Sequence, residues 1–430
     1  MKGPIAYIAH YLPALTQTFV YREILALEEA GWMVVPFSIR RPTKGISEDA
    51  RELAARTLYI VPLNPLLVLL RQVLLFLAHP LRYLKILFSL VASPGEPLKA
   101  RIHGLTHFFG AMHIVPELRR AGAQHFHAHF GQNPATIALA AAEYVGIPFS
   151  MTIHARDLFV DTHLLRTKLE RAKFVVTISE YNRKLLEALL PSKEVASKIH
   201  VLHCGVDLRK FETRSAVAAP VTDPRPPVFL AVGRLVEKKG YIHLIEAAKL
   251  LKDRGVKVVV RVIGGGPDHE LLTRRIQALQ VGEIVTLEGS MKQEKLLPLL
   301  READAFVLPC VLATDGDQDG IPVSLMEAMA CGIPCVSTTV SGVPELIESG
   351  KEGLLVPQKD STALADALEL LARNPELRHR LGEAARKKVA AEFTLSGLVR
   401  GLDALYTKSC ERTSERSDVR AEHRPPGVRC

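Results

Sequence analysis

The sequence predicts an α/β protein made of two doubly wound, parallel-sheet domains. Short apolar segments of strand length alternate with longer helical segments along nearly the whole chain. Such alternation is typical of parallel sheets with helices on both faces. The 430 residues suffice for two or three domains with full cores. An Ala- and Pro-rich segment at 214–227 has the composition of a linker. We therefore expect two Rossmann-like domains facing a central cleft.

Twelve apolar segments are the expected strands, six on each side of the linker. Those of the first half are Pro4–Ala9, Met33–Ser38, His125–His129, Phe149–Ile153, Phe174–Ile178 and His200–His203. Those of the second half are Val228–Val232, Val256–Ile263, Ile284–Glu288, Ala305–Leu308, Cys335–Thr338 and Gly353–Val356. We assign 1–213 to the first domain and 228–392 to the second. A further helix is expected at 393–409, and the polar residues 410–430 are expected to be disordered.

The charge balance indicates an anionic partner. The net charge is +9 and the pI is near 9.2, which suits phosphates, nucleic acid or an acidic membrane surface. Basic clusters interleaved with aromatic residues are missing from the sequence, so we expect no nucleic-acid partner. The six cysteines form no CxxC pair, which favours a reduced thiol state. We expect a cytoplasmic protein, either free or peripheral on the inner face of the plasma membrane.

An apolar and basic insertion occupies about residues 58–103. The runs Leu66–Leu70 and Val73–Leu77 are strongly apolar, but prolines and charges interrupt them before the ~20 residues that a membrane span needs. Two interpretations remain open. One is an interfacial helical hairpin with basic residues near lipid phosphates; the other is a pair of ordinary core helices. The basic residues are Arg71, Arg82, Lys85, Lys99 and Arg101.

Two carboxylates lie eight positions apart across a predicted junction between a loop and a helix. Asp319 follows the strand Ala305–Leu308, and Ser324–Ala330 favours a helix with Pro322 in its first turn. A helix N-terminus at the carboxyl end of a strand attracts anions. Glu327, one to two turns into this helix, offers two acceptors to vicinal hydroxyls. Phosphate binding beside hydroxyl binding points to a nucleotide-sugar.

Two cations follow the first strand of the second half. Arg234 and Lys239 lie in the loop Gly233–Gly240, and ligands of doubly wound sheets bind at the carboxyl ends of strands. The planar fork of Arg234 and the compact charge of Lys239 together suit a diphosphate. The plainer alternative for this segment is a solvated basic loop.

Two neighbouring motifs favour neither a dinucleotide nor a metal. The glycines of Gly264–Pro267 do not complete a GxGxxG pattern, because His269 stands in the sixth position, so they are better explained by a tight turn. The segment beginning at Asp315 starts like a calcium loop, but its twelfth position is Met326 and a strand precedes it. We expect no resident cofactor and no metal, because Arg234 and Lys239 already suit a diphosphate.

Polar residues also follow the expected strands of the first half. His154 ends one strand, where an unshifted imidazole would titrate near neutrality. His127 and His129 share one strand face, but no third ligand is evident, so a metal is not expected there. His129 is a candidate to line the cleft. Thr16 and Gln17 follow the first strand and either face the cleft or cap a helix.

Taken in order, these motifs resemble glycosyltransferase family 4, retaining enzymes of the GT-B fold, over roughly residues 1 to 405. Within that family the chain is similar to bacterial exopolysaccharide transferases of the colanic-acid type. The segments that carry the resemblance begin at Tyr11, His127, Thr152, Cys204, Gly233, Gly264 and Asp319, and the last runs to Pro334.

The resemblance implies a role for each motif. Arg234 and Lys239 would bind the donor diphosphate, and Glu327, as the second Glu of the family's E-x7-E motif, the ribose hydroxyls. Asp319 replaces the first Glu, which contacts the donor sugar, and is one methylene shorter. His154 would lie near the reacting centre. The implied donor-binding set is Arg234, Lys239, Gly320, Ile321, Val323, Glu327, Gly265, Thr16 and Gln17; the catalytic set is His154, Asp319, Arg234 and Lys239; His129 is on the acceptor side.

The resemblance also implies an activity and an arrangement. The first domain would take the acceptor, the second would bind the donor, and the helix at 393–409 would cross back onto the first domain. The reaction would move a hexose-type sugar, with retention, from a nucleotide-sugar to a lipid-linked or oligosaccharide acceptor in polysaccharide biosynthesis. Two alternatives are a non-catalytic sugar- or nucleotide-binding protein of this fold and a nucleotide-sugar epimerase.

Overall fold

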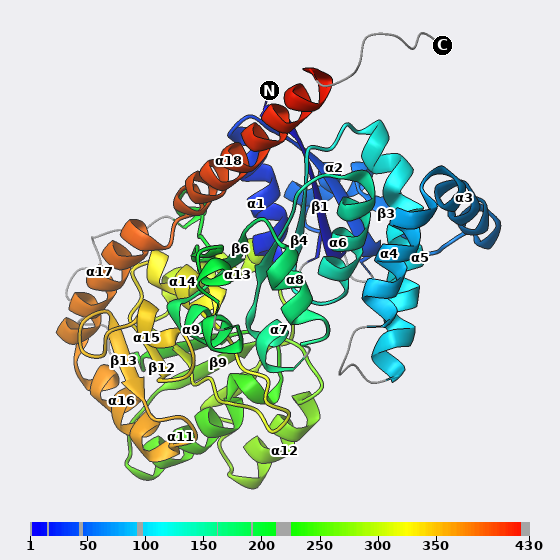
Figure 1. Cartoon of the computed structure of the whole chain (residues 1–430). Helices are drawn as coiled ribbons and strands as arrows, with labels where there is room; N and C mark the ends of the chain where they lie inside the picture. The colour runs from blue at the N-terminus through cyan, green and yellow to red at the C-terminus, as the bar shows by residue number, and fades with distance from the viewer. Residues whose placement is uncertain are drawn as a thin grey trace. The chain divides into compact units, whose positions relative to one another are not determined.

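The computed structural model describes residues 2–14, 17–42, 46–92, 98–160, 162–190, 192–211 and 225–422 (Figure 1). The chain divides into two compact units. The first unit comprises Met1–Thr177, Arg183–Leu202 and Leu398–Cys430, and the second comprises Ile178–Asn182 and His203–Gly397. Most of the predicted linker, 214–224, lies outside the described residues, and the first strand of the second unit begins at Val228.

The first unit is built on a seven-stranded parallel sheet in the order β3-β2-β1-β4-β5-β6-β7. Its strands are β1 (Lys2–Tyr11), β2 (Trp32–Arg40), β3 (Leu58–Tyr59), β4 (His125–His129), β5 (Phe149–Ile153), β6 (Val175–Thr177) and β7 (Ile199–Val201). Its helices are α1 (Thr18–Glu29), α2 (Arg51–Arg56), α3 (Pro65–Ala78), α4 (Pro80–Val91), α5 (Leu98–Arg120), α6 (Asn133–Val145), α7 (Ala155–Phe159), α8 (Leu165–Arg171), most of α9 (Glu180–Leu189), α10 (Lys193–Ala196) and most of α18 (Leu395–Glu422). Every residue of β4 and β5 is buried, as expected of strands covered on both faces.

The second unit is built on a six-stranded parallel sheet in the order β10-β9-β8-β11-β12-β13. Its strands are β8 (Val228–Val232), β9 (Val259–Ile263), β10 (Val285–Leu287), β11 (Ala305–Leu308), β12 (Cys335–Thr338) and β13 (Gly353–Val356). Its helices are α11 (Tyr241–Asp253), α12 (His269–Ala278), α13 (Gln293–Glu302), α14 (Val323–Ala330), α15 (Val343–Leu346), α16 (Ser361–Arg373) and α17 (Pro375–Glu392), and the short 3-10 helix η3 spans Glu237–Lys239.

The two sheets confirm the predicted fold class. Six of the twelve predicted strands, namely β4, β5, β8, β11, β12 and β13, coincide with the structure residue for residue. The edge strand β3 was not predicted, because two residues show no alternation. The strand order reverses between β1 and β4 and between β8 and β11. Ligands of doubly wound sheets bind at the carboxyl ends of strands beside such a reversal.

The long helix α18 begins in the second unit and joins the first from Leu398 onward. Within the first unit, Tyr406 Oη lies 2.6 Å from Tyr7 Oη of β1, and Trp32 Nε1 donates a hydrogen bond of 2.8 Å to Asp403. The helix continues to Glu422, where we expected a disordered tail from 410. No proline or glycine follows Gly401 until Pro425, so no helix breaker stops it earlier. Residues 423–430 lie outside the described residues.

The insertion at 58–103 forms β3, α3 and α4 and begins α5. Figure 1 shows α3 at the outer margin of the first unit, beyond α4 and α5. Only Gln72 and Leu75 of α3 are buried, so the interpretation of two ordinary core helices does not hold for α3. Among the described residues, no single helix has the length and composition of a membrane span. The pair α3 and α4, bent by 118°, passes that test only when taken together.

Candidate active site

The loop after β8 is held against the end of β11 by a glycine. Gly240 has φ +67°, and a Cβ placed on it would lie 1.9 Å from the carbonyl oxygen of Pro309, so no larger residue fits. This close approach turns the chain from η3 into α11 and leaves Lys239, the last residue of η3, facing the segment that follows β11. Local backbone geometry therefore brings the predicted basic loop to the predicted acidic loop.

Lys239 and Asp319 form a largely buried ion pair. Lys239 Nζ lies 2.7 Å from Asp319 Oδ2, and their side chains are 13% and 15% exposed. Lys238 Nζ lies 3.4 Å from Asp319 Oδ1 and 3.1 Å from Asp317 Oδ2. The thiol of Cys310, just after β11, donates a hydrogen bond of 3.5 Å to Asp319 Oδ2. Asp319 is thus the shared acceptor of two lysines and a thiol.

The mutual attraction keeps both members of this pair charged at neutral pH. Burial raises the pKa of Asp319, but Lys239 and then Lys238 outweigh that effect, so the pKa is lowered. Burial lowers the pKa of Lys239, but Asp319 outweighs that effect and the pKa is raised; Arg234 acts in the opposite direction. An arriving diphosphate would therefore meet a charged lysine and compete with Asp319 for it.

Arg234 and Gly265 lie on adjoining loops at the carboxyl ends of β8 and β9. The N–H of Leu235 donates a hydrogen bond of 3.1 Å to the carbonyl of Gly265. A Cβ on Gly265 would lie 2.6 Å from Ser290 Oγ. Arg234 is exposed, and within the described part of the chain its guanidinium forms no ion pair. Its charge is therefore available to an anion.

The N-terminus of α14 offers a group of backbone donors. Pro322 is the N-cap, so it lies just before the first turn, in which we expected it, and the helix begins at Val323. No acceptor among the described residues takes a hydrogen bond from the N–H groups of Gly320, Ile321, Val323 or Ser324. Glu327, further along the same helix, is 9% exposed. Cations, free helical N–H groups and a buried carboxylate thus lie on segments that meet at the β8–β11 reversal.

Tyr241 lies near the ion pair of Lys239 and Asp319, and the sequence analysis missed it. A Cβ on Gly233 would lie 2.8 Å from Tyr241 Oη and 3.3 Å from Lys239 Cε, which places the phenol beside the lysine. Tyr241 Oη is buried without a hydrogen-bond partner among the described residues. Burial raises the pKa of this phenol, and Cys310 and Asp319 add to the effect. The hydroxyl therefore remains a neutral donor. The position of Tyr241, directly after Gly240 and at the start of α11, could have indicated in the sequence that this side chain lies near the site.

In the first unit, His154 is the N-cap of α7 and is buried. Its backbone N–H donates a hydrogen bond of 2.8 Å to Asp157 Oδ2, and its Nε2 lies 3.5 Å from His129 Nδ1. Burial, and then the proximity of His129, lower the pKa of His154 well below the usual value. The predicted titration near neutrality is therefore wrong for this environment, and His154 acts as a neutral donor or acceptor at pH 7.

His129 belongs to a buried hydrogen-bonded chain and is only 1% exposed. His129 Nε2 lies 2.9 Å from Glu23 Oε1 of α1, and Tyr7 Oη donates a hydrogen bond of 2.9 Å to the same oxygen. Tyr7 in turn contacts Tyr406 of α18. His129 therefore lies in the interior next to His154, whereas we expected it to line a cleft.

Glu23 also supplies a third side chain able to bind a metal beside His127 and His129, which the sequence did not reveal. Single ligand atoms of Glu23, His127 and His129 lie within 4.8 Å of one another. The two nitrogens of His127, however, lie 2.8 Å from Ser150 Oγ and 3.0 Å from Thr152 Oγ1. His129 and Glu23 are already bonded to each other. These polar atoms are satisfied by protein groups, so the cluster needs no ion to explain it.

The remaining predicted residues have less defined roles. Gln17 is the N-cap of α1, but its side chain forms no capping bond, and its Oε1 is buried without a partner among the described residues. Thr16 lies outside the described residues. Of the predicted site, the second unit contains Arg234, Lys239, Gly265, Asp319, Gly320, Ile321, Val323 and Glu327, with Lys239 and Asp319 in direct contact, and the first unit contains Gln17, His129 and His154.

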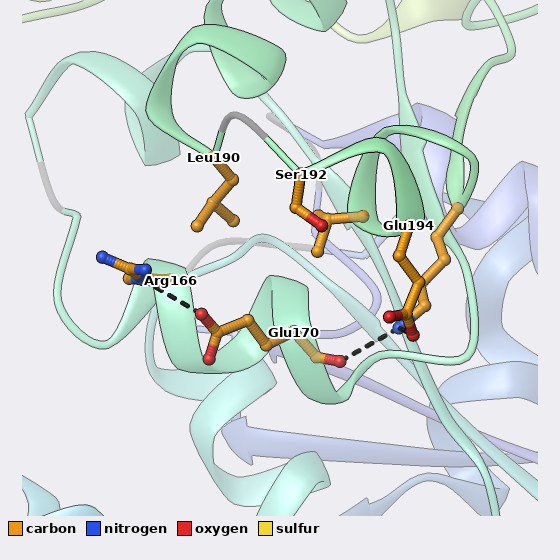
Figure 2. A pocket seen from close by; sticks show the side chains of 7 residues that line it. Arg166, Glu170, Leu190, Ser192 and Glu194 are labelled. Atoms are coloured by element: carbon orange, nitrogen blue, oxygen red, sulfur yellow. Dashed lines mark hydrogen bonds and ion pairs between the residues drawn. The ribbon is translucent and has the colours of Figure 1, made fainter.

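A cavity of about 260 Å³ opens elsewhere on the first unit (Figure 2). It is lined by Arg166, Glu170, Leu190, Ser192, Glu194, Val195 and Lys198. Arg166 Nε lies 3.0 Å from Glu170 Oε1 across its rim. None of the predicted site residues lines this cavity, and its charged side chains already pair with one another, so we do not assign it to the reaction.

Comparison with known sequences divides the chain at 210–214, close to His203, where the main part of the second unit begins. The family described as Glycosyltransferase Family 4 matches residues 17–210, and the family described as Glycosyl transferases group 1 matches residues 214–388. A putative colanic acid biosynthesis glycosyltransferase, WcaL of Salmonella typhimurium, is 36% identical over 290 residues, which is 65% of this chain and 69% of the relative. The amylovoran biosynthesis glycosyltransferase AmsK of Erwinia amylovora is 41% identical over 200 residues, 46% of this chain and 48% of the relative.

A solved structure extends the likeness of fold over almost the whole chain. Anabaena Alr3699/HepE, in complex with UDP and glucose, aligns with a TM-score of 0.66 at 16% identity, covering 94% of this chain and 100% of that one. At this identity the likeness concerns the fold alone, which is GT-B. The match to WcaL, by contrast, is close and long enough to show kinship. The chain belongs to glycosyltransferase family 4 and is a transferase enzyme of that family.

Proposed function

We propose that the chain is a retaining hexosyltransferase that moves a sugar from a nucleotide-sugar to a lipid-linked or oligosaccharide acceptor in exopolysaccharide biosynthesis. The observation that carries the donor assignment is the set of groups at the β8–β11 reversal of the second unit. Arg234 and Lys239 supply two positive charges, and the α14 N-terminus supplies unpaired N–H groups. The complex of HepE with UDP and glucose and the names of WcaL and AmsK support the donor class and the pathway.

The chemistry follows from where charge develops. When the bond between the sugar C1 and the phosphate oxygen breaks, the diphosphate gains negative charge. Lys239, Arg234 and the N–H groups near Ile321 stabilise that charge more strongly in the transition state than in the bound substrate. The acceptor hydroxyl then bonds to C1 on the face that the phosphate leaves, and its proton passes to the departing phosphate oxygen. This route needs no protein nucleophile and retains the configuration.

The same geometry supports a reaction without a metal ion. A metal bound by the acidic loop would have to take Asp317 and Asp319 from Lys238 and Lys239, whose ammonium groups lie 2.7 to 3.4 Å from those carboxylates. The lysines carry out the neutralisation that a divalent cation would otherwise provide. Full activity in the presence of a strong chelator is the expected consequence.

Identification of the donor tests the proposal most simply. A panel of UDP-, GDP- and dTDP-sugars is screened by thermal shift, because a bound donor raises the unfolding temperature by mass action. Transfer is then measured with the donor that gives the largest shift and a lipid extract as acceptor. Product that forms only when acceptor is present supports a transferase. Donor turnover into an isomer without acceptor would favour the epimerase, and donor binding without turnover would favour the non-catalytic protein.

Glu327→Gln should weaken donor binding by roughly 10-fold or more, because a carboxylate accepts stronger hydrogen bonds from ribose hydroxyls than an amide does. Calorimetry with the identified nucleotide-sugar measures the change. The matched control is Glu270→Gln on α12, whose side chain is 77% exposed, and it should leave the affinity unchanged. Equal donor affinities for the Glu327→Gln variant and the unaltered chain would remove the ribose role.

A further inference from the structure

The outer helices of the first unit carry an unusual concentration of exposed apolar side chains. In the described part of the chain, 23 large apolar side chains are exposed, and 14 of them lie between Leu63 and Ile102. Leu66 is 80% exposed, Leu77 69% and Leu81 84%. A concentration of exposed apolar side chains of this size on a folded protein marks an interaction site. We define the apolar face as Leu66, Leu67, Leu69, Leu70, Val73, Leu74, Phe76, Leu77, Leu81, Leu84 and Phe88.

Specific contacts hold α3 in this position. Arg71 Nη2 lies 2.7 Å from Glu117 Oε1 of α5, and both side chains are less than one fifth exposed. Gln72 Nε2 donates a hydrogen bond of 3.3 Å to the carbonyl of Phe109, and Tyr83 Oη of α4 donates one of 2.9 Å to Gln72 Oε1. Leu75 is buried on the same side. One side of α3 is therefore firmly attached to α4 and α5, and the leucines on its other side are left without protein cover.

The shape of the apolar face suits a fluid medium better than a single protein partner. At ~100° per residue, the exposed apolar residues of α3 spread over about half of the helix circumference. The 14 residues of α3 rise only ~21 Å, which is less than the ~30 Å hydrocarbon layer of a bilayer. The chain then bends by 118° into α4. These dimensions fit a helix lying in the bilayer surface, with the apolar side immersed and the anchored side facing the protein.

The charges around the apolar face select the kind of lipid. The described residues 57–92 and 98–116 contain no aspartate or glutamate. Arg82 and Lys85 are both exposed on α4, between the exposed Leu81, Leu84 and Phe88. Each basic side chain near an anionic bilayer surface adds roughly 1 kcal/mol of attraction. The surface is thus apolar with cations beside it, which complements acyl chains together with anionic headgroups.

We propose that the apolar face of α3 and α4 docks onto a bilayer that contains anionic phospholipid. The leucines of α3 enter the boundary between acyl chains and headgroups, and Arg82 and Lys85 contact the phosphates. This inference rests on the proposed function for its purpose, because docking would bring the enzyme to a lipid-linked acceptor. The binding itself needs no transfer reaction and can be measured separately.

Flotation of the full chain with vesicles tests the proposal. Vesicles are made of phosphatidylcholine alone or of phosphatidylcholine with phosphatidylglycerol. The chain should float with the mixed vesicles, and the variant Leu69→Ser/Leu70→Ser/Leu74→Ser should partition at least ~10²-fold more weakly, because three leucines no longer leave water. The matched control is Leu189→Ser/Leu271→Ser/Leu370→Ser, with helical leucines 53%, 55% and 47% exposed elsewhere, and it should float like the unaltered chain. Lys85→Glu should lose roughly 10-fold on mixed vesicles and little on phosphatidylcholine alone.

Each other outcome overturns the proposal. Failure of the unaltered chain to float, or equal flotation of the two triple variants, rejects docking through α3. Concentration-dependent dimerisation without lipid, abolished by the α3 variant and accompanied by no flotation, would assign the face to a second copy of this chain. Calorimetry with the nucleotide-sugar on the same variants checks that the second unit is intact, so loss of membrane binding and failure of the donor assignment give different results.

Discussion

Lys239→Ala should lower kcat by at least ~10²-fold, on the scale of losing one preorganised electrostatic donor. Lys239 Nζ is the cation most deeply placed in the donor site, 2.7 Å from Asp319. Its removal takes charge from the place where the diphosphate becomes more negative, and it leaves Asp319 as a repulsive neighbour. Steady-state kinetics with the identified donor and acceptor measure the effect, and calorimetry separates loss of binding from loss of turnover.

The control for this substitution is another lysine in an ion pair on the same unit. Lys249, in α11, pairs with Asp253 one turn away, and its side chain is 36% exposed. Lys249→Ala should change kcat less than about twofold, because an exposed i,i+4 pair contributes only a few tenths of a kcal/mol. Near-normal transfer by the Lys239→Ala variant would contradict the assignment of Lys239 to the diphosphate.

The first unit should lose stability steeply as the pH falls below about 6.5. His125, His127 and His154 are buried and His107 is partly buried, and burial lowers the pKa of each, to about 3 for His107 and for His125. In the unfolded chain these groups bind protons near pH 6.5, so below that pH the unfolded state takes up more protons than the folded state. Each histidine then costs about 1.4 kcal/mol per pH unit until its folded-state pKa is reached. The four together contribute up to roughly 5 kcal/mol per unit.

The single tryptophan makes this prediction measurable. Trp32 lies in β2 and is 4% exposed, so its fluorescence reports unfolding of the first unit. Urea midpoints are recorded between about pH 7.5 and about pH 5. His125→Gln should reduce the slope by about a quarter, because one of the four titrating groups is lost. The exposed His269 of the second unit provides the control, and His269→Gln should leave the slope unchanged. Equal stability at both ends of the range would contradict the proposed burial of neutral histidines.

The sequence predicts the position of most strands well and their ends less well, for a physical reason. Central strands such as Phe149–Ile153 and Ala305–Leu308 are buried on both faces, so each is a continuous apolar run with polar or turn residues at its ends. The edge strand β3 has only two residues, and the edge strand β10 is one residue shorter at each end than predicted. The inner strand β6 is also one residue shorter at each end than predicted, whereas the edge strand β13 matches. A strand ends where its pairing with a neighbour ends, and this depends on the neighbour as well as on the strand itself.

The candidate site shows a similar limit. The segments containing Arg234, Lys239 and Asp319 can be found from their position after strands. Asp319 pairs with both Lys239 and Lys238 because the chain turns at Gly240. That turn requires Gly240 to approach the carbonyl oxygen of Pro309 closely, and no sequence pattern gives this distance. The bond between His129 and Glu23 joins residues 106 positions apart, and no local pattern indicates it. In α3 the composition is apolar, but composition alone does not tell a buried leucine from an exposed one.

A crystal structure of the chain with its nucleotide-sugar, or with the nucleoside diphosphate alone, tests the central claim most directly. We expect the diphosphate oxygens within hydrogen-bonding distance of Arg234 and of Lys239 Nζ, with backbone N–H groups at Ile321 or Val323 completing the contact. A diphosphate bound elsewhere, or Arg234 and Lys239 directed into solvent while the donor is in place, would contradict it.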